Sequence, residues 1–315
     1  MGSSPGPGTR RARPAARRRR SFLRVAGARL ALGLLALAGT VGALAQDPQP
    51  GASAAKGAQL DTDLVRTGLY LIRGGGGNSL LRLSANGMVL VDGKLPGNYR
   101  ALMLQVRRLS KLSDMSVRVL VLTDHHEEHA GDSTQFVAAR IPIVAQRNAL
   151  AHLSLPESSN AAAGLPVLSY DSERTLRMGG IEVQLKHFGN ARTDGDTVVY
   201  FPDLKIVALG DLFMPGPPEP DFCAGGSLAG WGAVLAQVLE LDFDRVVPGI
   251  GPVVDRDALV TFKAKVDAVV ARASALVRAG VGKDELMSQL RTDDLGWRFN
   301  FSGVALDRFY AELSR

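Results

Sequence analysis

The sequence predicts an α/β fold in which two β-sheets lie face to face and helices cover their outer faces. Three observations favour this architecture. Paired short apolar runs come first, runs that alternate with helical spacing follow, and a second set of strand-like runs then leads into long helices. Because a sheet or a helix must bury its apolar face against another element, this order of elements predicts two sheets packed between helices.

The first half of the chain is expected to supply the first sheet. Asn86-Gly87 separates two apolar runs and is a strong hairpin-turn signal. Residues 117–122 form an almost continuous apolar run, which is typical of a buried strand. The expected strands cover residues 69–73, 78–83, 88–92, 117–122 and 141–145, and the expected helices cover residues 99–109, 131–139 and 147–153.

The second half repeats this pattern. Ile181, Val183 and Leu185 alternate with polar residues, as in a half-buried strand. The expected strands cover residues 181–188, 197–201, 205–209 and 245–247, and the expected helices cover residues 231–241, 254–279, 284–291 and 304–313.

Residues 1–45 have the composition of a secretory signal peptide. They hold nine arginines and no acidic residue, and an apolar stretch ends in Ala43-Leu44-Ala45, a small-x-small cleavage pattern. The apolar stretch is shorter than the roughly 20 residues of a membrane span. Residues 19–23, Arg-Arg-Ser-Phe-Leu, resemble the twin-arginine export signal. We therefore expect a periplasmic or secreted bacterial protein without a membrane span after cleavage; an ordinary signal and an uncleaved anchor are the alternatives.

The charge of the chain changes sign when this leader is removed. The whole chain has a net charge of +6, but without the nine leader arginines 28 basic residues face 31 acidic ones. An acidic mature chain gives no support for a nucleic-acid partner, so a small-molecule substrate or ligand is expected. Residues 46–63 are expected to form a linker, and the single cysteine, Cys223, excludes an internal disulfide.

The densest group of chemically active side chains follows the expected strand at residues 117–122. Residues 124–129, Asp-His-His-Glu-Glu-His, hold three of the five histidines beside three carboxylates. Imidazole and carboxylate are ligands of borderline divalent metals, and α/β folds build their sites at strand ends. The pattern predicts a present or ancestral metal site on the loop after this strand, whereas the plainer interpretation is a solvated polar loop.

This segment resembles the signature of the metallo-β-lactamase superfamily, Thr-His-x-His-x-Asp-His-x-Gly-Gly. Asp124 stands in place of the first His and Glu128 in place of the Asp. The residues that match are Thr123, His126, His129 and Gly131. Further family-like motifs follow the same order, at residues 89–92, 191–196, 210–212 and 248–252. The resemblance covers about residues 65 to 260. It implies the four-layer αβ/βα sandwich of this family over residues 64–315, with the site at one edge between the sheets.

The resemblance also shows where the chain departs from the family's ligand set. Asp124 and Glu128 can still ligate through oxygen, but Arg192 is always cationic and has no lone pair to donate. Ile250 offers only hydrocarbon. A centre with two metals is therefore not expected. The seven ligand positions of the family fall on Asp124, His126, Glu128, His129, Arg192, Asp211 and Ile250.

Two outcomes are open at this point. In the first, one zinc or other divalent ion is held by some of the carboxylates and histidines above. The family then implies hydrolysis of an ester- or amide-type substrate by metal-bound water, with Glu128 and Asp211 as catalytic residues and Arg192 binding substrate. In the second, no metal binds. Arg192 then pairs with Asp124, Glu128 and Asp211, and the protein is an inactive periplasmic pseudoenzyme with a binding or regulatory role.

The other histidines and glycines carry weaker signals. His125 occupies a non-ligand position of the motif and is expected to point outward, while His152 is expected at the surface of a helix. His187 is expected beside the site as a supporting or core residue. Residues 74–77, four glycines, are expected to form a hairpin loop near the mouth of the site, since no Gly-Lys-Ser/Thr ending of a phosphate loop follows them.

Overall fold

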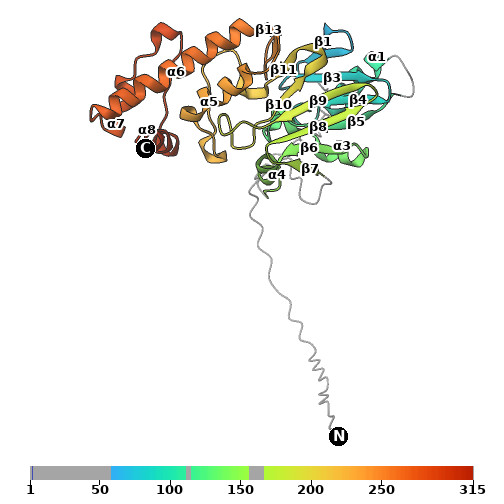
Figure 1. The fold of residues 1–315 in the computed structure, drawn as a ribbon, viewed down its shortest axis with the longest axis horizontal. Coiled ribbons are helices and arrows are strands. Elements are labelled where there is room, and N and C mark those ends of the chain that lie inside the picture. Colours follow the sequence, from blue (N-terminus) through green and yellow to red (C-terminus); the bar gives the residue numbers. More distant parts are fainter. Residues whose placement is uncertain (1, 3–57, 111–114, 156–166, 315) are drawn as a thin grey trace, which may run out of the picture. The chain divides into compact units, whose positions relative to one another are not determined.

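The computed structural model describes residue 2 and residues 58–110, 115–155 and 167–314. All of its helices and strands lie in one compact unit, residues 52–315 (Figure 1). The predicted signal peptide, apart from Gly2, and most of the predicted linker fall outside the described residues. Within the described ranges, no helix has the length and apolar character needed to cross a membrane.

The first sheet has seven strands, and their order in space follows their order in the chain. Neighbouring strands run antiparallel from β1 to β4 and parallel from β4 to β7. Its strands are β1 (Asp61–Arg66), β2 (Leu69–Arg73), β3 (Ser79–Ser84), β4 (Gly87–Val91), β5 (Val117–Val121), β6 (Ile143–Gln146) and β7 (Val167–Tyr170). The first strand thus begins slightly before residue 64, the expected start of the domain.

The second sheet has six strands in the order β13-β12-β11-β10-β9-β8. Its strands are β8 (Glu173–Met178), β9 (Ile181–Lys186), β10 (Val198–Phe201), β11 (Ile206–Ala208), β12 (Arg245–Val247) and β13 (Val254–Asp255). Only the pairing of β11 with β12 is parallel. Strands at both edges of this sheet, β8 and β13, were not predicted, because their polar or very short sequences lack a clear apolar alternation.

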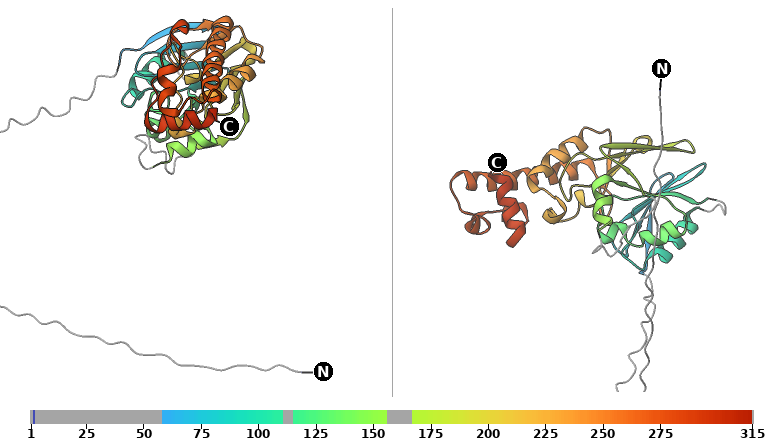
Figure 2. Two further views of the ribbon diagram at one scale, coloured as in Figure 1. Left: turned by 90° about the vertical axis from the view of Figure 1, so that its left-hand side faces the viewer. Right: turned by 90° about the horizontal axis from the view of Figure 1, so that it is seen from below.

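Helices cover the outer faces of both sheets, so the predicted four-layer sandwich is confirmed. Apolar side chains from the two sheets fill a central core, and a separate apolar core lies between each sheet and its helices. The main helices are α1 (Tyr99–Ser110), α3 (Ser133–Ala138), α4 (Arg147–Leu153), α5 (Leu228–Leu239), α6 (Arg256–Arg278), α7 (Lys283–Gln289) and α8 (Gly303–Leu313). Figures 1 and 2 show α6, α7 and α8 on the side away from α1 and α3.

The segment around the histidines differs from the prediction. Instead of one helix over residues 131–139, a short helix α2 (Glu127–Ala130) precedes α3. Glu128 and His129 therefore lie on a helical turn and not on a loop. Asp132 adopts a left-handed conformation between the two helices, with φ of 60°, and this turn breaks the helix.

Loops from the two sheets meet at one edge of the sandwich. The amide of Thr197, just before β10, donates to the carbonyl of Thr123 at 2.7 Å. The amide of Asn78 donates to the carbonyl of Gly249 at 2.7 Å, and its side-chain amide donates to Pro248 and Gly251. These bonds join the predicted motif segments of both halves into one site.

Candidate metal centre

The site is built on a buried aspartate at the end of β4. Both carboxylate oxygens of Asp92 accept hydrogen bonds from Thr123, from its amide and its hydroxyl, each at 2.7 Å. One of these oxygens also accepts from Nδ1 of His129 at 3.0 Å. Asp92 thus ties β4 to the loop after β5 and fixes the orientation of the His129 ring.

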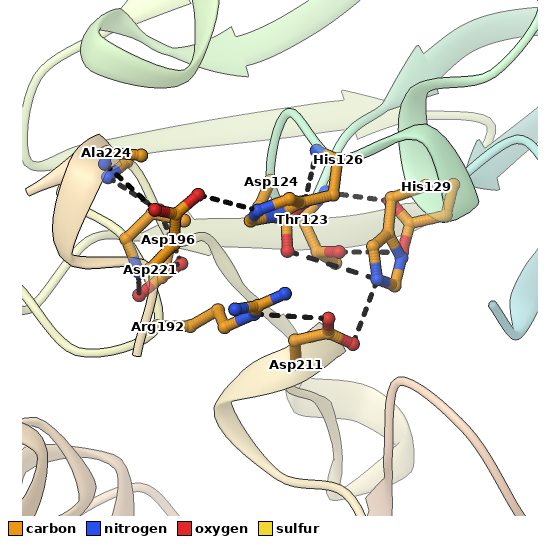
Figure 3. Close-up of polar contacts among 12 residues, drawn as sticks. Thr123, Asp124, His126, His129, Arg192, Asp196, Asp211, Asp221 and Ala224 are labelled. Atoms are coloured by element: carbon orange, nitrogen blue, oxygen red, sulfur yellow. Dashed lines mark hydrogen bonds and ion pairs between the residues drawn. The ribbon is translucent and has the colours of Figure 1, made fainter. Parts of the chain in front are cut away.

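The inner cluster consists of Asp124, His129 and Asp211. All three are buried, and one ligand atom of each lies within 4.8 Å of the others. Nε2 of His129 lies 3.0 Å from Oδ1 of Asp211 and 3.9 Å from Oδ2 of Asp124 (Figure 3). The fully buried ring therefore presents Nε2 to two carboxylates while Asp92 holds Nδ1.

Close backbone packing holds Asp211 in place. It lies in a 3-10 turn, Gly210–Leu212, directly after β11. Gly249 packs so tightly against the Asp211 carboxylate that a side chain could not fit there. The indole nitrogen of Trp231, on α5, donates to the carbonyl of Leu212 at 3.0 Å. Helix α5 thus supports the loop that carries the carboxylate.

Arg192 enters the same region from the loop between β9 and β10. Its Nε lies 3.5 Å from Oδ2 of Asp211, and its Nη1 donates to the carbonyl of Glu219 at 2.6 Å. Figure 3 shows the guanidinium beside Asp211. The predicted contact with Asp211 is therefore present as a long ion pair. Within the described residues, Arg192 forms no ion pair with Asp124 or Glu128.

An outer cluster, His125, His126 and Asp221, lies beside the inner one. Nε2 of His126 lies 3.1 Å from Oδ2 of Asp221, and its Nδ1 lies 3.2 Å from Oδ1 of Asp124. The ring of His125 stacks between His126 and His152, with centroids 4.4 and 4.5 Å apart. The expectations that His125 points outward and that His152 is only a surface residue are wrong, because these rings pack against one another.

The predicted ligand groups are thus divided differently in space. The family's ligand positions imply one group of Asp124, His126 and Asp211 and a second group of Glu128, His129 and Asp211. The structure instead joins Asp124 and Asp211 to His129, and it places His126 with His125 and Asp221. Glu128 belongs to neither group of donor atoms within the described residues.

The structure also places Ile250 and His187, two further residues considered in the sequence. Ile250, where the family has its last histidine, is 49% exposed. His187, expected beside the site as a supporting or core residue, is hydrogen-bonded through Nδ1 to the carbonyl of Asp196 at 2.8 Å. Neither residue contributes a ligand atom to the described donor groups.

Burial and neighbouring charges shift the protonation of the site in opposite directions. Burial alone would lower the pKa of His129, but the carboxylates of Asp124, Asp211 and Asp92 outweigh it and hold that pKa well above its ordinary value. Burial alone would raise the pKa of Asp124, but the charge of His129 and the hydrogen bond from His126 hold it below its usual range. Without an ion, the inner cluster is therefore a charged imidazolium–carboxylate network.

The inner cluster offers donors for one divalent ion. A ligating histidine commonly donates its other ring N–H to a carboxylate, as His129 does to Asp92, and two oxygen ligands complete a partial coordination shell. A second ion at the family's other position would face the guanidinium of Arg192, and like charges at short range are unfavourable. The inner cluster is therefore a candidate site for one ion.

The glycine loop lies against this centre as expected. Nζ of Lys94 donates to the carbonyls of Ile72 and Gly77, each at 2.7 Å. These two hydrogen bonds hold both ends of the glycine loop. The amide of Gly77 donates to the carbonyl of Glu128 at 3.1 Å. Burial lowers the pKa of Lys94 to about 7. Sequence reasoning missed this lysine, because nothing local distinguishes it from a surface lysine.

Asp221 was also missed. It caps a 3-10 turn, Phe222–Ala224, with its Oδ1 accepting from the amides of Cys223 and Ala224. Its other oxygen reaches His126, which is 95 residues away in the chain. Aspartate is a common cap residue, but only the fold brings Asp221 to a histidine.

Comparisons with known proteins agree with this architecture. The model of the family described as the metallo-beta-lactamase superfamily matches residues 72–250. A curated relative, the 2,4-dinitroanisole O-demethylase subunit alpha of Nocardioides sp. (strain JS1661), is 28% identical over 233 residues, which cover 71% of this chain and 68% of that one.

Solved structures show the same fold. A metallo-beta-lactamase from Pontibacter korlensis aligns with a TM-score of 0.59 and 19% identity, over 66% of this chain and 99% of that one. The metallo-beta-lactamase FIM-1 from Pseudomonas aeruginosa, solved in its mono-zinc form, aligns with a TM-score of 0.55 and 18% identity, over 69% of this chain and 98% of that one.

Proposed function

The chain belongs to the metallo-β-lactamase superfamily, and from this premise we propose that it is an exported hydrolase with a single divalent metal ion, zinc or a similar ion, at the inner cluster. The observation that carries the proposal is the arrangement of His129. Its Nε2 meets Asp211 and Asp124 while Asp92 holds Nδ1, which is how a ligating imidazole is oriented.

The residues around the ion have separate proposed roles. A bound ion would supply Lewis acidity, which activates water and polarises the substrate. Asp124, His129 and Asp211 would hold it. Glu128, which lies outside both donor groups, is proposed as the base that takes a proton from the attacking water. The guanidinium of Arg192 is proposed to bind the substrate oxygen on which negative charge develops.

The substrate is proposed only as a class. Superfamily membership favours an ester- or amide-type bond, and the named activity of the Nocardioides relative extends the class to an activated aryl methyl ether. The name of that relative also describes it as one subunit of a larger protein. A substrate screen should therefore include 4-nitrophenyl esters and 2,4-dinitroanisole.

A second function is favoured by a different observation. Arg192 contacts Asp211, and both ring nitrogens of His129 meet carboxylates, so the buried acids are already neutralised without an ion. In this alternative the protein is an inactive pseudoenzyme with a salt-bridged site and a binding or regulatory role.

Metal content separates the two functions. The mature, untagged protein is dialysed against trace zinc, iron and manganese and then analysed for elements. The hydrolase requires an ion that is retained in the unaltered chain and lost from Asp211→Asn and His129→Ala. A folded chain whose inner cluster retains no ion would refute the hydrolase and support the pseudoenzyme.

A double substitution tests the same site by a gain of metal binding. Arg192→His with Ile250→His restores histidine at both family positions, and it is expected to raise the metal content above that of the unaltered chain. Ser314→His with Glu240→His, far from the site in sequence, serves as the control for added histidines. Unchanged metal content in the first variant would contradict the placement of these two positions.

A further inference from the structure

Two histidines and an aspartate outside the inner cluster form a second group of metal-type donors. We propose that His125, His126 and Asp221 bind a divalent cation of the kind that prefers imidazole, such as Zn²⁺ or Co²⁺, at a rim site next to the inner cluster. One ligand atom of each lies within 4.8 Å of the other two. Two imidazoles and a carboxylate with open positions are a recognised ligand set for such ions.

His126 and Asp221 are already oriented for this role. Oδ1 of Asp221 is used by the amides of Cys223 and Ala224, so Oδ2 alone faces Nε2 of His126, at 3.1 Å. The other ring nitrogen of His126 is held by Asp124 at 3.2 Å. This repeats the arrangement of His129 and Asp92, in which a carboxylate on one ring nitrogen directs the other towards the ligand position.

His125 supplies the least expected donor. Its Nδ1 is buried and has no hydrogen-bond partner within the described residues. A buried polar atom without a partner is costly, and an ion is one way to satisfy it. The ring is fixed on both faces, because it stacks on His126 at 4.4 Å and on His152 at 4.5 Å.

His152 completes the stack and is not itself a proposed ligand. Its Nε2 is bonded to Oδ1 of Asp194 at 2.9 Å, which fixes the ring. It therefore supports His125 from the side opposite His126, and it adds a carboxylate to the surroundings. His152 provides a matched control, since it has the same chemistry and the same stacking contact as His125 but a different partner.

The rim site and the inner cluster share no proposed ligand. The contact between His126 and Asp124 links them, but because no ligand is shared, each site can be emptied separately. The backbone of Arg192 anchors Asp221, because the amide of Asp221 donates a hydrogen bond to the carbonyl of Arg192 at 2.7 Å.

The test uses the full, untagged chain titrated with Co²⁺ and Zn²⁺, with bound metal counted after equilibrium dialysis and Co²⁺ coordination followed by visible absorption. His125→Phe keeps the ring stack and removes the nitrogen, and Asp221→Asn keeps the cap and removes the charge. Each is expected to bind one ion fewer than the unaltered chain or to weaken that ion at least tenfold. His152→Phe is expected to keep it, and Asp211→Asn is expected to remove only the inner ion.

Circular dichroism shows whether each variant is folded. If either His125→Phe or Asp221→Asn does not fold, the other variant tests the proposal by itself. The proposal is overturned if His125→Phe and Asp221→Asn bind the same number of ions, with the same affinity, as the unaltered chain. It is also overturned if His152→Phe loses the ion equally, because the histidines would then bind metal without a defined site. A folded chain that binds no Co²⁺ or Zn²⁺ overturns it as well. A rim ion that persists in Asp211→Asn supports it, even if the inner cluster proves empty.

Discussion

Each ring nitrogen of His129 meets a carboxylate from a different part of the chain. Asp92 comes from the end of β4 and Asp211 from the turn after β11, and these contacts leave the ring no freedom to rotate. The same residue is thus a structural link between the two sheets and a proposed ligand. The orientation of one imidazole therefore depends on the packing of both halves of the sandwich.

Asp92→Asn tests this orientation. The amide removes the negative charge that faces Nδ1, so Zn²⁺ affinity of the inner cluster is expected to fall by about 10- to 100-fold. Affinity is measured by competition with a chromophoric chelator. Asp242→Asn makes the same change at an exposed ion pair with Lys205 and should leave affinity unchanged. Equal Zn²⁺ affinity in Asp92→Asn and the unaltered chain would show that Asp92 does not orient the ligand.

Lys94 gives the stability of the fold a pH dependence. Burial lowers its pKa to about 7 from 10.5. Below pH 7 both the folded and the unfolded chain hold the proton, and the buried charge destabilises the fold. Between pH 7 and 10.5 only the unfolded chain holds it, so this residue's contribution makes the fold more stable as pH rises.

Lys94→Met is expected to remove that rise. It also lowers stability throughout, since the carbonyls of Ile72 and Gly77 lose their donor. The free energy of unfolding is measured by urea titration at several pH values from 7 to 10. Lys283→Met, at the surface beside Asp307, is the control. The assignment of this pH dependence to Lys94 fails if the slope is the same in Lys94→Met and in the unaltered chain.

At the scale of secondary structure, the short helix α2 depends on the glycine that ends it. Gly131 has no room for a side chain, because a Cβ would overlap the carbonyl oxygens of Lys94 and Glu127. The family-like glycine at this position is therefore needed for close packing of α2 on the loop after β4. This packing sets the position of His129 two residues earlier.

Gly131→Ala is expected to destabilise the protein by about 2 kcal/mol or more, because the backbone must move to accept the methyl group. It should also weaken metal binding at the inner cluster. Gly282→Ala, where no atom lies within 4 Å of the added methyl, should change the free energy of unfolding by less than about 0.5 kcal/mol. Urea unfolding of both variants measures the difference; equal stabilities would mean that α2 can shift without cost.

At the scale of the whole molecule, the chain combines a basic leader with an acidic remainder. The predicted twin-arginine signal lies outside the described residues, so export to the periplasm remains a proposal. Arg19→Lys with Arg20→Lys is expected to leave the uncleaved precursor in the cytoplasm, because the receptor reads the arginine pair. Cell fractionation and intact mass measure this. Arg10→Lys with Arg11→Lys is the matched control, and export of both variants would favour an ordinary signal.

The sequence by itself determined the fold class and the limits of the chemistry. Apolar periodicity and the order of the motifs predicted the two sheets and their helices, because burial of apolar faces depends on local pattern. The types of Arg192 and Ile250 limited the expected ligands, because a guanidinium and a hydrocarbon side chain have no lone pair to donate to a metal. Edge strands such as β8 escaped prediction, since Glu173–Met178 has few apolar residues and shows little of this pattern.

Only the tertiary structure decided which donors meet. It joined Asp124 and Asp211 to His129, turned His126 towards Asp221, and brought His152 from α4 onto the ring of His125. Apart from Asp124 and His129, these partners are tens of residues apart in the chain. Their distances depend on how loops from two sheets pack at one edge, and no local pattern encodes that packing.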